Sequence, residues 1–203
     1  MDPSRRFFIL GSLAELVLAL IGMILCGLLV PDALSGFRWR VGDALAGGLA
    51  VLPMLLFFFA SYHSAWRPLA EIRRCLEEWL HPIIQPWSVG QLLVVSVLAG
   101  VGEELLFRGA VQGGLERWVG PWPALVIASL IFGLLHSVTW SYIILATFMG
   151  AYLGVLWNYS GNLLAPIVAH VGYDFVALLY LRSRPPAPPI GKREEDSRTS
   201  GVD

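Results

Sequence analysis

The sequence predicts an all-α polytopic membrane protein with about six transmembrane helices and one amphipathic interfacial helix. The first observation is composition: of 203 residues, 56% are hydrophobic and only 14% are charged, whereas soluble domains carry roughly 25% charged residues. The second is a series of apolar stretches of about 20 residues, the length that spans a bilayer as a helix. The third is that the tryptophans lie at the ends of these stretches, where their rings prefer the headgroup level.

Six segments are candidates for the transmembrane helices. They are residues 7–30, 43–62, 89–115, 121–138, 141–159 and 162–182. The tryptophans expected at their ends are Trp39, Trp66, Trp79, Trp87, Trp118, Trp122, Trp140 and Trp157.

The amphipathic helix is predicted between the second and third segments, in "WRPLAEIRRCLEEWLHPIIQPW". Charged and apolar residues alternate there at helical spacing, as in helices that lie in the membrane interface. Its apolar face would consist of Leu69, Ile72, Leu76, Trp79 and Leu80.

Three regions follow from this organisation. Residues 1–88 form an N-terminal two-span region with the interfacial helix, residues 89–182 a membrane core, and residues 183–203 a disordered tail rich in proline and charge. Six spans put both termini on one side, and the excess of arginine on that side predicts the cytosolic face of a cell (inner) membrane. The composition offers no basic face for nucleic acid, and the two cysteines no disulfide framework.

Six ionisable residues lie within the last spans, and their presence there has to be explained because a charge in hydrocarbon costs at least ~2.5–3.5 kcal/mol. They are Glu103, Glu104, Arg108, His136, His170 and Asp174. Three others, Glu15, Asp43 and His63, are placed near span ends. The presence of these six residues on three spans is the strongest indication of function in the sequence.

Helical geometry sorts these residues. Glu104 and Arg108 are four apart, about 40° around the axis, and are expected to pair. Glu103, about 100° away, is then free to face another helix. Two imidazoles can hold a water or a metal, and a carboxylate kept from bulk water suits general-base work. Each residue alone also has a structural interpretation as an interhelical contact.

At these residues the sequence resembles the CPBP intramembrane proteases, which include CAAX prenyl endopeptidases and bacteriocin-processing or self-immunity proteins. The motif E-E-x-x-x-R is "EELLFR", from Glu103 to Arg108, F-x-x-x-H is "FGLLH", from Phe132 to His136, and H-x-x-x-N/D is "HVGYD", from His170 to Asp174. All three occur in order on separate spans, and together they are far more specific than any one motif.

The resemblance implies an intramembrane endopeptidase acting on a peptide or membrane-anchored protein near the membrane surface. Glu103 would activate a water held by His136 and His170, and Asp174 would assist the oxyanion or orient a histidine. Glu104, Arg108 and Phe132 would support the site. The same two histidines and Glu103 also suffice for a three-ligand zinc site, so a metal-dependent and a metal-free mechanism both stay open.

Two other functions remain as alternatives: a non-catalytic scaffold or immunity protein of the same fold, and a small transporter or proton relay. One geometric difficulty concerns the two histidines. In the predicted spans His136 lies about 15 residues from the start and His170 about 8, a difference of ~10 Å in depth.

Overall fold

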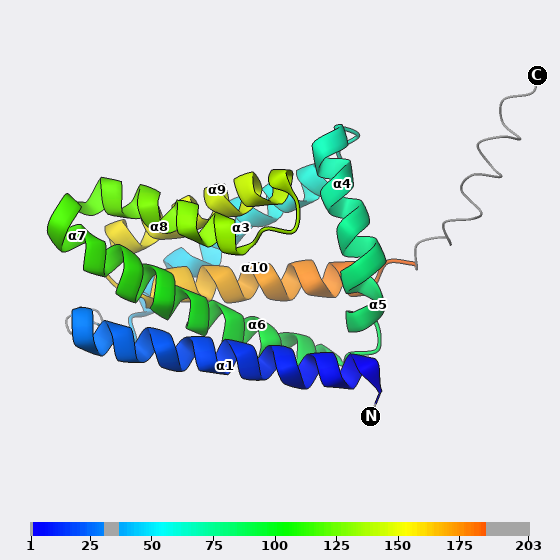
Figure 1. Cartoon of the computed structure of the whole chain (residues 1–203), viewed down its shortest axis with the longest axis horizontal. Helices are drawn as coiled ribbons and strands as arrows, with labels where there is room; N and C mark the ends of the chain where they lie inside the picture. The colour runs from blue at the N-terminus through cyan, green and yellow to red at the C-terminus, as the bar shows by residue number, and fades with distance from the viewer. Residues whose placement is uncertain (1, 31–36, 186–203) are drawn as a thin grey trace, which may run out of the picture.

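The structure is a computed structural model that describes residues 2–30 and 37–185, and this part of the chain is helical throughout, without strands (Figure 1). The elements are α1 (Pro3–Leu29), α3 (Val41–Tyr62), α4 (Arg67–Cys75), η1 (Leu76–Leu80), α5 (His81–Ile84), α6 (Val89–Glu104), η2 (Leu105–Gln112), α7 (Gly113–Val119), α8 (Pro121–Leu135), α9 (Trp140–Ser160) and α10 (Leu164–Arg182). The two η elements are π-helical. The predicted all-α membrane fold is confirmed.

Five helices of the described chain are long and apolar enough to cross a membrane. They are α1, α3, the continuous run from α6 through α7 (Val89–Val119), α9 and α10. The fourth predicted segment is a helix too, but α8 has only 15 residues and is about 22 Å long. It ends at Leu135 because the chain turns there into a short loop before Trp140. Every predicted segment is therefore helical, and one is too short to span the bilayer alone.

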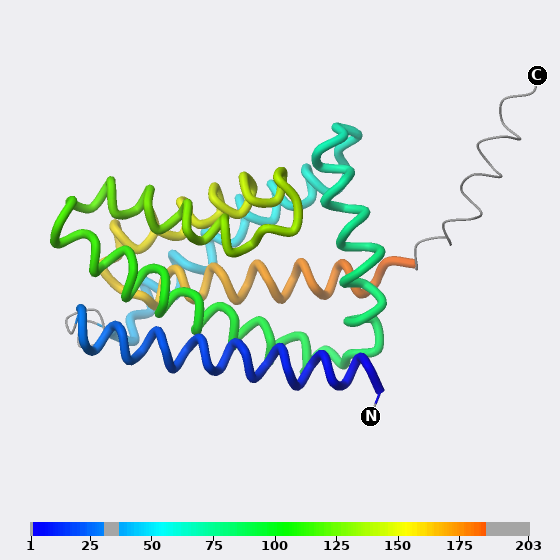
Figure 2. Tube along the Cα trace, in the orientation of Figure 1, coloured from blue at the N-terminus to red at the C-terminus, as the bar shows by residue number. Residues whose placement is uncertain are grey.

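The central helix of the bundle is the α6–η2–α7 run. Helix α1 lies along it, α3 lies along α10, and α8 and α9 form an antiparallel hairpin (Figures 1 and 2). Small residues permit the closest approach: a Cβ on Gly102 would lie 2.9 Å from the backbone oxygen of Glu15. The first region of the chain thus packs directly on the motif-bearing helices.

The π-helical segment η2 follows directly after Glu104. Single π-helical turns within α-helices occur frequently at functional sites. Here η2 begins one residue after the paired acids and contains the buried Arg108, so the irregular backbone coincides with the first motif.

The predicted amphipathic segment is divided into α4, η1 and α5 and crosses one end of the bundle (Figure 1). Ile72 is buried and Trp79 is 73% exposed, yet both line one hollow together with Leu76 and Leu80, so these four residues share a face as predicted. The Trp79 side chain is the most exposed of the four. Its exposed ring at a bundle end still suits the membrane interface.

Trp87 differs from the prediction that the tryptophan rings lie exposed at the headgroup level. It is only 5% exposed, its indole N–H donates to the Ser4 hydroxyl at 2.9 Å, and its ring contacts Phe8 edge-on at 5.3 Å. Trp87 therefore fastens the start of α1 to the bundle.

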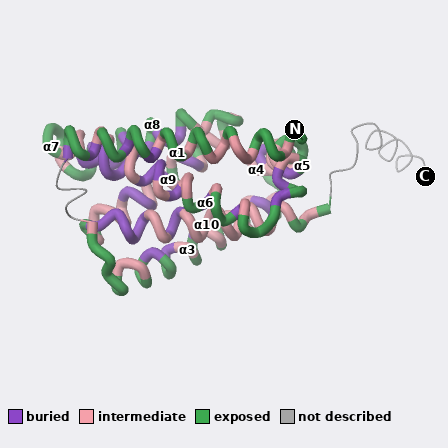
Figure 3. The backbone as a smooth tube through the Cα atoms, turned by 90° about the horizontal axis from the view of Figure 1, so that it is seen from below, coloured by how far each residue is buried: buried purple, intermediate pink, exposed green. Residues whose placement is uncertain are grey.

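The outer faces of the bundle carry the exposed residues (Figure 3). Many of them are large and apolar, including Leu10, Leu56 and Leu134, an arrangement that suits lipid contact and not water. The start of α1 and the end of α10 lie at the same end of the bundle (Figure 1). Most of the predicted tail, residues 186–203, lies outside the described residues.

Candidate active site

The side chains of the three motifs meet inside the bundle. Glu103 Oε2 lies 3.8 Å from His136 Nε2 and 3.8 Å from His170 Nε2. The three residues come from α6, the C-terminal end of α8 and α10. One carboxylate oxygen thus faces both imidazoles.

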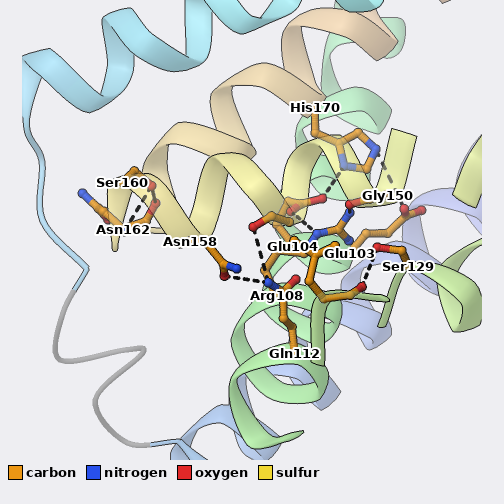
Figure 4. A network of polar contacts seen from close by, with 12 residues as sticks. Glu103, Glu104, Arg108, Gln112, Ser129, Gly150, Asn158, Ser160, Asn162 and His170 are labelled. Carbon is orange, nitrogen blue, oxygen red and sulfur yellow. Dashed lines mark hydrogen bonds and ion pairs between the residues drawn. The ribbon is translucent and has the colours of Figure 1, made fainter. Parts of the chain in front are cut away.

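The other nitrogen of each imidazole is held by a separate partner. His136 Nδ1 is 2.8 Å from the backbone oxygen of Phe132, which accepts only, so Nδ1 donates and Nε2 presents its lone pair. His170 Nδ1 is 2.9 Å from Glu104 Oε1 (Figure 4), and the carboxylate orients this ring in the same way. Both rings therefore turn Nε2 toward Glu103.

Phe132 has a second contact with its histidine. The Phe132 and His136 rings are stacked with centroids 4.3 Å apart. The hydrogen bond to the Phe132 backbone oxygen and the ring contact together fix the orientation of His136 from within its own motif. The spacing of four residues explains both contacts, because it places the two side chains one turn apart.

Glu104 and Arg108 form the expected pair. Glu104 Oε2 lies 3.2 Å from Arg108 Nε, and both side chains are buried. Arg108 also donates from Nη2 to the Gly150 backbone oxygen at 2.8 Å (Figure 4). Its guanidinium lies 4.9 Å from the centre of the Phe132 ring. The pair therefore connects the first motif to α9 and to the second motif.

Asp174 lies one turn after His170, with Oδ2 3.5 Å from His170 Nε2. Its side chain is 26% exposed and forms part of the wall of a cavity of about 170 Å³. Apolar and aromatic residues of α3, α9, α10 and the α4–η1 segment line most of the rest of that cavity, together with Ser61 and Arg73. His136, at 28% exposed, leaves a second side of the site open.

The difficulty raised by the depths of His136 and His170 does not arise in the structure, because both face the same oxygen of Glu103. His136 follows the first residue of α8 by 15 positions, and His170 follows that of α10 by 6. The starts of these helices must therefore be offset along the bundle by roughly 13 Å. The sequence-based estimate assumed a common starting depth.

The residues do not, as placed, form a metal-binding set. Within the described ranges, no group of three or more His, Cys, Asp or Glu side chains is arranged to hold a metal ion. Zinc held by Glu103, His136 and His170 stays a prediction, and no chemical step is derived through it.

Sequence reasoning misplaced Glu15. It lies in the middle of α1, not near its end, and interacts electrostatically with Glu103, Asp174 and both site histidines. The sequence feature that could have pointed to Glu15 is its position well inside the apolar segment 7–30, with no cation one turn away to pair with it.

Comparison with known proteins supports the family resemblance. Residues 85–176 match the family model described as type II CAAX prenyl endopeptidase Rce1-like, so the resemblance to the CPBP proteases is confirmed for the segment that carries the motifs. A Bacillus subtilis (strain 168) protein described as "Uncharacterized protein YpbD" is 32% identical over 98 residues, 47% of this chain and 48% of that protein. The chain thus spans about half the length of this relative. No solved structure matches significantly.

Proposed function

We propose that this multi-pass membrane protein is an intramembrane endopeptidase in which Glu103 activates a water held by His136 and His170. The observation that supports the proposal best is the convergence of both Nε2 atoms on Glu103 Oε2 at 3.8 Å. Imidazole nitrogens on two sides and a carboxylate on the third are the groups that orient a water and remove its proton.

The proposed reaction needs only residues of this cluster. Glu103 takes a proton from the water as the water oxygen attacks the carbonyl carbon of the peptide bond. The C–N bond then breaks, and the proton on Glu103 passes to the leaving amine, so the products are a carboxylic acid and an amine. Asp174, which faces His170 Nε2 at 3.5 Å, would donate to the developing oxyanion when protonated.

The surroundings of the cluster suit a membrane substrate. The cavity beside Asp174 is walled by residues such as Phe57, Leu145 and Leu178, and apolar walls with a few polar groups are typical of ligand sites. We infer a peptide or membrane-anchored protein as substrate, in a cell membrane with both termini in the cytosol.

The test measures cleavage of a fluorogenic library of short and lipidated peptides by purified protein. Glu103→Gln, His136→Ala and His170→Ala should each lose about 10²–10⁴-fold in kcat/KM while remaining folded. Glu71→Gln and His63→Ala are matched controls, since both residues are exposed, and should cleave as the parent does. If the site variants cleave normally, the cluster is structural and the scaffold alternative is favoured.

Metal analysis of the same samples decides the remaining choice. Because no described set of residues is arranged to hold a metal, cleavage should survive dialysis against a chelator. Loss of activity on dialysis, restored by zinc, would contradict the metal-free form of the proposal and leave the peptidase activity standing.

A further inference from the structure

Glu15 is the one acidic residue of α1, a helix that lies outside the segment matched by the family model. Its backbone oxygen would be 2.9 Å from a Cβ on Gly102, the residue before Glu103. This close approach of α1 to α6 places the backbone of Glu15 beside the helix that carries Glu103, and the Glu15 carboxyl group interacts electrostatically with Glu103.

One oxygen of the Glu15 carboxyl group lacks a hydrogen bond within the described chain. This oxygen, Oε2, is buried, and Glu103 Oε2 is likewise buried and makes no hydrogen bond. Glu103 is itself only 9% exposed and points into the cluster between the two imidazoles. Two carboxylate oxygens without hydrogen bonds in a membrane interior are costly, which favours a role in binding over one in packing.

Packing of α1 does not need this side chain. The same face of the helix carries Ala19, Gly22 and Cys26, all buried, and small residues are what let membrane helices approach closely. A large acid on such a face works against close packing, so its presence calls for another explanation.

The charges around Glu15 show which chemistry would complete it. Those that act on it most strongly come from two acids, Glu103 and Asp174, and then from the two site histidines. Arg108, the cation of the cluster, already pairs with Glu104 and donates to Gly150. The cluster therefore has more carboxyl groups than cations to pair with them.

We propose that Glu15 is a specificity-determining residue whose carboxylate binds a basic side chain of the substrate close to the scissile bond. The inference rests on the proposed peptidase activity and adds a substrate class to it. A lysine suits the position because its flexible apolar stem lies along the helices while its ammonium reaches the acid. The Glu15 side chain as a whole is half-buried.

The test uses pairs of fluorogenic peptides that differ at one position in lysine or acetyl-lysine, which have similar shape but different charge. The position is scanned along the peptide. The full-length protein should prefer lysine at one position by about tenfold or more in kcat/KM, the size of a charge-assisted hydrogen bond. Glu15→Gln should bring that ratio close to one, and Glu15→Asp should restore part of it.

Two further variants separate recognition from packing. Ser12→Ala removes another buried, unpartnered polar atom from the same face, and Glu71→Gln removes an exposed acid in α4. Both should keep the lysine preference. The inference is overturned if the parent has no such preference, or if Glu15→Gln slows both peptides of a pair equally.

A binding measurement distinguishes this inference from the proposed function. The Glu103→Gln variant should bind the lysine peptide more tightly than its acetylated partner, and the double variant with Glu15→Gln should bind both alike. If the parent cleaves no peptide but this difference in binding appears, the peptidase proposal fails and charge recognition by Glu15 stands. Cleavage without the difference overturns only the role of Glu15.

Discussion

The polar network at the α9–α10 turn and the cluster around Glu103 both lie among apolar helices, but their hydrogen bonding differs. At the turn, Asn162 donates to the Arg38 backbone oxygen and to Asp43 Oδ2, both at 2.7 Å. Its side-chain oxygen accepts from the backbone N–H of Leu164 at 3.2 Å. The polar atoms of the Asn162 side chain are all used.

The cluster around Glu103 leaves buried polar atoms without hydrogen bonds. They belong to Glu15, Glu103, Glu104 and Arg108, and for Glu104 and Arg108 the ion pair at 3.2 Å is close but not aligned as a hydrogen bond. Buried polar groups that serve stability are almost always satisfied. The difference indicates that the Asn162 network fixes a turn, whereas the cluster is arranged to act on something that enters it.

Loss of Arg108 should have the largest effect on stability. Arg108→Met leaves Glu104 buried without its cation, and breaking a buried pair from one side costs about 3–5 kcal/mol in the free energy of unfolding. Thermal unfolding in detergent measures this. Activity should fall as well, because Glu104 orients His170.

The control is the double variant Arg108→Met with Glu104→Gln. Removing both charges eliminates the unpaired acid, so most of the lost stability should return while activity stays low. If the single variant is as stable as the parent, the pair contributes nothing to the stability of the fold, and the stabilising role assigned to it is wrong.

Asn162→Ala should have an intermediate effect, on stability alone. The change leaves the Asp43 carboxylate and the Arg38 backbone without their partner, at about 1–3 kcal/mol. Asn162 lies at a helix turn away from the cluster (Figure 4), so kcat/KM of the folded protein should match the parent. A fall in kcat/KM without loss of stability would mean that the Asn162 network also serves activity, which contradicts the difference between the two networks.

Much of the fold was predictable because hydropathy and the length of apolar segments are local properties. All six segments and the Glu104–Arg108 pair were found from spacing. The end of α8 and the offset of its start from α10 were not, since they depend on packing between helices. The burial of Trp87 was not predicted either, because it depends on contacts with α1.

The candidate site was predictable to the extent that each motif lies on one helix. Spacing gave the partners within a motif, such as Phe132 with His136. It gave no distance between motifs, and only the structure brings both histidines to one oxygen of Glu103. Glu15 was undervalued because a single acid in an apolar segment has no pattern, and its approach to Gly102 depends on how α1 and α6 pack.

Asp174→Asn should have the smallest effect and the sharpest meaning. The third motif of the family ends in either Asn or Asp, and Asp174 faces His170 Nε2 at 3.5 Å. An amide N–H donates there or to an oxyanion as a protonated acid would, so kcat/KM should change by no more than about tenfold. Asp174→Leu removes the donor and should cost about 10²-fold. If Asn is as damaging as Leu, Asp174 acts through its negative charge, and its place in the mechanism moves from donor to general base.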